Sequence, residues 1–345
     1  MIRPALLPLL LLPFLAAPGR LAAWDYEGHR IVAQLALASL PADFPPIAAG
    51  PAEAERIAFL SAEPDRWRNV PDLPLKHAGG SWGDHFLDLE YLTDAGLDLE
   101  TLTSFRYEFV LQFARGRAAH AGAFKPIDPA RNQDRTAEWP GFAPWAIAEH
   151  FARLRSGFSY LRVFEEVGTP AEVADARANL LYVMGLLAHY VGDCAQPLHT
   201  TKHYNGSSGD NPRGYTTWNG LHAWIDGGII ARTGLRFPAL RERALPPRVL
   251  PLGPRADGRD PLFVAVLDYI RVQHRQVERI YELEKAGRLG RAPGEEVPAE
   301  TRRLIEDQLL AGGQMLASVW LTAYRGAVPD TYLRAAIARR QTAAP

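Results

Sequence analysis

The segment LLAHYVGDCAQPLHTTKHYNG, residues 186–206, combines an apolar run with polar side chains that can do chemistry. His189 and Asp193 are four residues apart, so a helix would place them on one face, one turn apart. His199 follows Pro197, a residue at which that helix must end. A buried carboxylate or imidazole needs polar partners. The spacing therefore indicates either a hydrogen-bonded core pair or a metal site.

A second pair repeats this spacing. His222 and Asp226 are four residues apart in LHAWID, again among apolar neighbours. A single pair of this kind is more often a hydrogen-bonded core pair, whereas two pairs together with His199 favour metal ligation. Imidazole nitrogens and carboxylate oxygens are a good ligand set for zinc, and no thiolate is among them.

The first 23 residues have the pattern of a secretory signal peptide. Arg3 precedes an apolar run over residues 5–17, and small residues follow up to Ala23. The run is short for a membrane span and contains two prolines. We therefore expect an exported protein, periplasmic or extracellular, that is cleaved near Ala23 and has no transmembrane anchor afterwards.

Further candidate ligands lie upstream of the two pairs. Asp65 and Arg68 are three residues apart in PDRWR, and His85 stands in the apolar run WGDHFLDLEYL. Cleavage after Ala23 would free the α-amine of Trp24, whose unperturbed pKa is about 8. That amine and its own carbonyl can chelate a metal ion, and His29 follows on the next helical turn. Removal of the signal would thus create a ligand.

Composition and periodicity predict a single all-α domain over residues 24–345, with long loops. Of the 345 residues, 47% are hydrophobic and 22% charged, and the net charge of −1 indicates neither a nucleic-acid-binding basic surface nor an acidic tail. The one cysteine, Cys194, cannot form an intramolecular disulfide and is expected to be buried. Apolar residues recur every three or four positions. This predicts helices at 28–40, 52–68, 106–121, 144–167, 171–196, 221–231, 261–285, 299–325 and 330–339. The largest loops are expected at 122–141, 200–219 and 241–260.

The order of these residues resembles the zinc-dependent nuclease/phospholipase C superfamily. Its members are secreted single-strand-specific nucleases and bacterial zinc phospholipases C. A matching residue type stands at each ligand position of the family's three-zinc site: Trp24, His29, Asp65, His85, His189, Asp193, His199, His222 and Asp226. The resemblance runs from Trp24 to Asp226 and more loosely into the C-terminal helices.

The resemblance implies how three Zn²⁺ ions would be shared. The first would be held by Asp65, His85, His189 and Asp193. The second would be held by the Trp24 amine and carbonyl, His29 and Asp193, so that Asp193 bridges two ions. The third would be held by His199, His222 and Asp226. Three zinc ions and three carboxylates leave the pocket at about +3, which suits a phosphodiester anion.

The implied reaction is phosphodiester hydrolysis by a zinc-activated hydroxide, with Arg68, Asp65 and Asp193 as the catalytic residues. The third zinc would stabilise the leaving oxygen, and Arg68 would neutralise charge that develops on the phosphoryl oxygens. The alternative for Arg68 is a surface arginine paired with an acidic residue.

The choice of substrate depends on the walls of the site. Phe86 and Asp88 match the positions at which the nucleases hold a base, by stacking and by a carboxylate hydrogen bond; alternatively, Phe86 is core and Asp88 a cap. The Trp-x4-His spacing, an Asp at 226 and the 22-residue loop before His222 favour a nuclease. A long insertion between His85 and His189 favours the phospholipase branch. Its Trp139, Phe142 and Trp145 line a cleft or, as we expect, pack the core.

We therefore expect a monomeric endonuclease that hydrolyses single-stranded DNA and RNA, or nucleotides, to 5′-phosphorylated products. The first alternative is a phospholipase C acting on phosphatidylcholine-type lipids. The second is a non-catalytic periplasmic zinc-binding protein, which would not need Arg68 beside the cluster. HExxH and Gly-rich phosphate-loop motifs are absent from the sequence, which disfavours a zincin protease and a nucleotide-driven enzyme.

One extra residue before Trp24 should cost activity and the second zinc, because a peptide N–H cannot replace an amine as a ligand. Zinc content and phosphodiesterase activity of a Met-Trp24 protein, compared with the cleaved protein, test this. A fully active Met-Trp24 protein with three zinc ions would contradict the N-terminal chelate.

Overall fold

The described residues of the chain are helices joined by loops. The computed structural model describes residues 24–68, 70–73, 75 and 81–342, so the predicted signal peptide lies outside them. This part contains no β-strand; the backbone bridges Leu87–Gly141 and Tyr204–Gly206 are isolated. The all-α prediction is confirmed. Within the same residues, no helix is both long enough and apolar enough to cross a membrane.

The helices follow the predicted ranges with three notable differences. The expected helix 52–68 is broken at Ser61, 261–285 is broken at Arg275, and 171–196 already ends at Asp193. The elements are α1 Tyr26–Ser39, α2 Pro51–Leu60, α3 Glu63–Arg68, α5 Ser81–Asp84, α6 Leu89–Asp94, α7 Arg106–Ala119, α8 Ala143–Val167, α9 Pro170–Asp193, α10 Leu221–Ala223, a π-helical turn Trp224–Gly228, α11 Ile229–Thr233, α12 Phe237–Leu240, α13 Pro261–His274, α14 Gln276–Lys285, α15 Ala299–Arg325 and α16 Thr331–Thr342. The three expected loops are irregular apart from short 3₁₀ turns.

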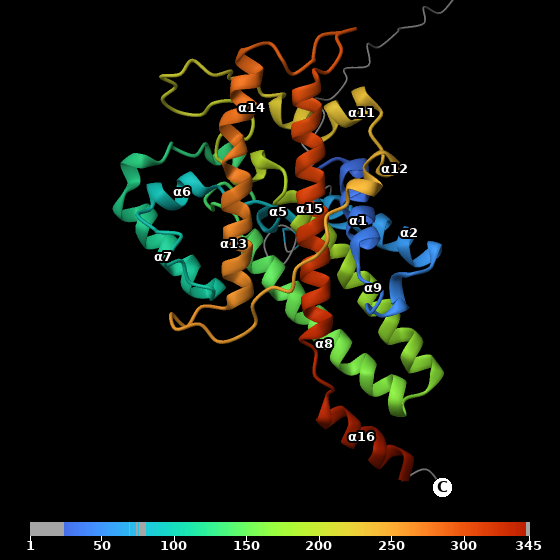
Figure 1. Ribbon diagram of the computed structural model, residues 1–345. Helices are drawn as coiled ribbons and strands as arrows, with labels where there is room; N and C mark the ends of the chain where they lie inside the picture. The colour runs from blue at the N-terminus through green and yellow to red at the C-terminus, as the bar shows by residue number, and fades with distance from the viewer. Residues whose placement is uncertain (1–23, 69, 74, 76–80, 343–345) are drawn as a thin grey trace, which may run out of the picture.

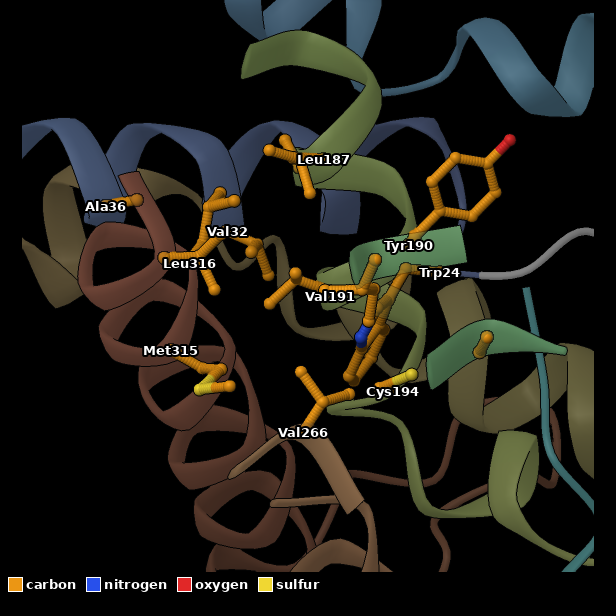
Figure 2. Packing of buried hydrophobic residues seen from close by; sticks show 14 of the residues in the cluster. Trp24, Val32, Ala36, Leu187, Tyr190, Val191, Cys194, Val266, Met315 and Leu316 are labelled. Atoms are coloured by element: carbon orange, nitrogen blue, oxygen red, sulfur yellow. The ribbon is translucent and has the colours of Figure 1, made fainter. Parts of the chain in front are cut away.

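The core is built around α1, α9 and α15. α15 runs through the middle of the molecule, with α13 and α14 on one side and α1 and α2 on the other in the view of Figure 1. Figure 2 shows Val32 of α1, Val191 of α9 and Leu316 of α15 meeting in one cluster. Cys194 is buried in the same cluster, as expected.

α1 and α15 approach closely because α15 has glycine at the crossing. A Cβ on Gly313 would lie 2.6 Å from the Leu35 Cβ, and one on Gly312 would lie 3.2 Å from the nearest methyl carbon of Val32. Distances under 3 Å are incompatible with packed side chains, so the backbones lie too near for any larger residue. This packing fixes where α1 places its polar side chains.

The C-terminal half of α9, which includes His189 and Asp193, lies in the interior of the protein. The N-terminus of α9 has a capping box, in which the Thr169 side chain accepts from the Glu172 N–H while the Glu172 carboxylate accepts from Thr169, and Pro170 is at the first helical position. Residues 183–193 form its apolar C-terminal half, and all but Val183 are buried. α9 packs against α1, α2, α8 and α15, and both His189 and Asp193 are fully buried.

Gly313→Ala should lower the free energy of unfolding by about 1–3 kcal/mol, because the added Cβ overpacks the crossing against Leu35. The loss outweighs the gain in helix propensity of about 1 kcal/mol. Urea unfolding followed by circular dichroism measures it. Gly122→Ala is the control, since its Cβ would meet nothing within 4 Å. Equal stability of the two variants would contradict the close packing.

Candidate metal centre

The first His/Asp group joins three helices. His29 of α1, Asp65 of α3 and His189 of α9 bring one ligand atom each to within 4.8 Å of one another. Both histidines are fully buried, and their rings stack with centroids 4.4 Å apart. Asp65 is partly exposed. The group therefore has two nitrogen donors and one oxygen donor, an arrangement that can hold a metal ion.

Asp193 lies against both histidines of this first group. Its Oδ1 is 3.2 Å from the His29 Nε2 and its Oδ2 is 3.1 Å from the His189 Nε2. The His189 Nδ1–H donates to the Ser61 carbonyl at 3.0 Å, which leaves Nε2 as the atom that faces the carboxylate. The break between α2 and α3 at Ser61 thus orients a candidate ligand. Asp193 is itself fully buried.

Gly192 makes room for this arrangement. A Cβ at this position would lie 3.2 Å from the His29 Nδ1, tighter than nine in ten real Cβ contacts. A larger side chain here would press on the His29 ring, so the glycine keeps α9 close to α1 at the level of the first group.

The second group consists of His199, His222 and Asp226, all buried, with ligand atoms again within 4.8 Å of one another. The Asp226 Oδ2 lies 3.0 Å from the His222 Nε2, and its Oδ1 lies 3.8 Å from the His199 Nε2. His199 stands on the 3₁₀ turn Pro197–Thr200 after α9, and its Nδ1–H donates to the His85 carbonyl at 3.2 Å. The Nε2 of His199 is thereby directed into the group.

A wide turn of helix carries Asp226. Residues Trp224–Gly228 are π-helical, an irregularity frequently found at functional sites. Gly227 lets the Asp25 carboxylate approach, since a Cβ there would lie 2.2 Å from its Oδ2. The Asp25 N–H also donates to the Asp226 carbonyl at 3.4 Å. The backbone beside Trp24 is therefore attached to the second group, while α1 continues to His29 in the first.

Burial and charge at the second group fit a cation. Burial raises the pKa of Asp226, but the His222 and His199 imidazoles outweigh it and lower the pKa to about 2. The carboxylate is therefore ionised at neutral pH, as a metal ligand must be. In the described part of the chain, the buried His199 Nε2 and Asp226 Oδ2 make no aligned hydrogen bond. A metal ion would take both atoms.

The remaining predicted ligands lie beside the two groups. His85 is buried but belongs to neither His/Asp group. Its ring centroid is 5.4 Å from that of His199. Trp24 is fully buried, with its ring near Val191 and Cys194 in Figure 2. Arg68 is the last residue of α3, and its side chain lies outside the described part, so its role stays a prediction.

Phe86 and Asp88 lie on a backbone strip beside the second group. The N–H of Leu87 donates to the His199 carbonyl at 2.9 Å, and that of Asp88 donates to the Pro140 carbonyl at 2.7 Å. Phe86 is partly exposed, with its ring 5.1 Å from His85, so it is not simply core. Asp88 occupies the N-cap position of α6, but its side chain makes no capping hydrogen bond there. Burial, and then the nearby Glu90, raises the pKa of Asp88 well above its ordinary value.

Two contributors to the site were missed in the sequence. Gln196 is fully buried and its side-chain amide donates to the Asp226 Oδ1. The ring of Tyr204 lies 5.6 Å from that of His222. A polar Gln196 between an apolar helix and Pro197 was a visible signal. The place of Tyr204 depends on the path of a loop, for which the sequence has no comparable signal.

The chain has no match among known protein-family models or curated proteins.

Asp193→Asn should cost two bound metal ions per chain and Asp226→Asn one, because each Asp193 oxygen faces a different histidine while Asp226 serves one group. Metal content by mass spectrometry of purified protein tests this. Asp25→Asn is the control: it keeps a good α1 cap next to the site and should retain the metal content of the parent. Equal metal loss from the Asp193 and Asp226 variants would rule out sharing by Asp193.

Proposed function

We propose that this protein is a zinc-dependent phosphodiesterase of the nuclease/phospholipase C superfamily, most specifically an endonuclease for single-stranded DNA and RNA that leaves 5′-phosphates. One observation carries the proposal: two His/Asp groups, buried apart from Asp65, lie near the end of α9, and the N-terminal residues of α1 touch both. The ligand order of that family requires this meeting of distant segments.

The residues would divide among three zinc ions as the resemblance implies. Asp65, His85, His189 and Asp193 would hold one ion, and the Trp24 amine and carbonyl, His29 and Asp193 a second; the third would take His199, His222 and Asp226. When bound, the ions would lower the pKa of water toward 7 and offset phosphate charge.

The chain's own groups orient these ligands. The carbonyls of Ser61 and His85 fix the ring orientations of His189 and His199, and Gln196 donates to Asp226. Such outer contacts commonly change metal affinity or activity by about 10–100-fold when removed. The buried positions of the ligands limit their motion, so a phosphodiester would meet a preformed site.

The walls favour a nucleobase over a choline headgroup. Phe86 offers an aromatic face, on which any base can stack. The raised pKa of Asp88 favours its protonated, uncharged form, which can both donate to and accept from a base edge. A choline headgroup is a cation, which an aromatic face can also bind but which an uncharged carboxyl attracts only weakly. This supports the nuclease over the phospholipase alternative.

A paired assay tests the proposal on protein purified from the exported fraction. Single-stranded DNA and phosphatidylcholine vesicles are supplied in parallel, with and without a chelator, and zinc is counted on the same sample. We expect DNA cleavage that the chelator abolishes and added zinc restores, because the metal ions supply the positive charge that the protein lacks. Asp226→Asn serves as a matched variant of impaired metal binding.

The outcomes separate the candidates. Release of phosphocholine without DNA cleavage would move the substrate to lipids and keep the metal site. Bound zinc with neither activity would support a zinc-binding protein without catalysis. DNA cleavage that persists without metal would overturn the mechanism altogether.

A further inference from the structure

An aromatic hollow lies between α7 and the loop that follows it, outside both His/Asp groups. Its volume is about 550 Å³, within the range of sites for small ligands. Phe113, Phe124 and Trp139 supply ring faces to its lining, and Arg117 and Lys125 supply positive charge. Trp139 and Phe124 are partly exposed, whereas Phe113 is buried beneath them. Trp139 therefore lines a surface hollow, while Trp145 is core as expected.

The cations of this hollow are held against its rings and its rim. The Arg117 guanidinium lies 4.5 Å from the centre of the Phe124 ring and donates to the Glu138 carbonyl at 3.0 Å. Lys125 is exposed and donates to the Ser208 hydroxyl at 3.1 Å, where two long loops meet. The acidic Glu138 side chain in the lining is 3.6 Å from Arg135. Ring faces next to positive charge are what single-stranded nucleic acid requires.

A backbone ladder joins the hollow to the metal centre. Leu87 lies between the segment of His199 and the segment of Gly141. Its N–H donates to the His199 carbonyl, and it forms a backbone bridge with Gly141. The Asp88 N–H donates to the Pro140 carbonyl, directly after Trp139. Trp139 thus directly precedes Pro140 and Gly141, the two residues whose backbones contact the strip that carries Phe86 and Asp88.

Aromatic side chains cover the same path on the surface. The Tyr91 ring stacks on Phe124 with centroids 5.7 Å apart, and the Lys202 ammonium lies 5.4 Å from the Tyr91 ring centre. Burial, then Asp88 and Tyr204, raises the pKa of Tyr91 to about 12, while Arg117 opposes this. Tyr91 thus extends the aromatic lining of the hollow through Phe124, and the Tyr204 ring lies 5.6 Å from that of His222 in the second group.

We propose that this hollow is a second nucleotide subsite, which binds a base and its phosphate in the single strand beyond the bond that is cleaved. The proposal rests on the proposed function and adds where a longer strand is held. Trp139 stacks with the base, Phe124 forms the apolar wall beside it, and Lys125 and Arg117 contact the phosphate. An acyl chain would fit this lining poorly, because both cations would lose hydration without gaining an anion.

Steady-state kinetics of the zinc-loaded protein on a single-stranded 12-mer and on a dinucleotide test the subsite. Trp139→Leu keeps an apolar side chain but removes the stacking face, and we expect it to raise KM for the 12-mer about tenfold with kcat unchanged. Lys125→Ala should lower the slope of log KM against log salt by about 0.7, as expected for one lost phosphate contact. Neither variant should change kcat/KM for the dinucleotide, which spans only the cleaved bond.

Lys285→Ala is the matched control. Lys285 is also exposed and also contacts the loop at 200–219, through the Arg213 carbonyl, but on α14 away from the hollow. It should leave both substrates unaffected. Unchanged 12-mer kinetics in both hollow variants would overturn the subsite while the nuclease stands, and an equal loss on both substrates would assign these residues to folding instead. A wild-type protein that cleaves only phospholipid would overturn both proposals.

Discussion

The arrangement of this protein depends on one buried carboxylate between two imidazoles. Asp193 is fully buried and lies within 3.2 Å of a nitrogen of both His29 and His189. Removing an ionised carboxylate from water costs several kcal/mol unless positive charge and hydrogen bonds offset it. Such a group is tolerated only if the elements around it are held rigidly. The close contacts of α1, α3 and α9 therefore serve the site as much as the fold.

Backbone proximity, rather than side-chain size, provides that rigidity. Glycine at 312 and 313 lets α15 press on α1, and Gly192 leaves space for the His29 ring. At the other end, Asp25 caps α1 and touches the turn that carries Asp226. One helix thus positions a ligand of the first group while its cap is attached to the second. Displacement of α1 would disturb both groups together.

Local geometry explains what the sequence predicted well. The four-residue spacing of His189 and Asp193 places both on one helical face in any fold, and α15 has the predicted bounds. The break at Ser61 was missed although Pro64, three residues later, is typical of the first turn of a new helix. The Ser61 carbonyl matters only through His189, more than a hundred residues away. Likewise, Trp139 lines a hollow because distant backbone segments pair beside it, and periodicity has no information on such pairing.

The wide turn at Trp224–Gly228 bears on how the chain tolerates changes of length. A π-helical turn holds one residue more than an α-helical turn, so deletion of a single residue there would restore regular helix with little local disturbance. The same deletion would close the wide turn that holds Asp226 and Gly227, and would therefore change the directions in which these two residues face. Gly227 would then leave Asp25, and Asp226 would leave the turn that faces His222. A shortening that is locally harmless would thus separate both ends of the candidate site.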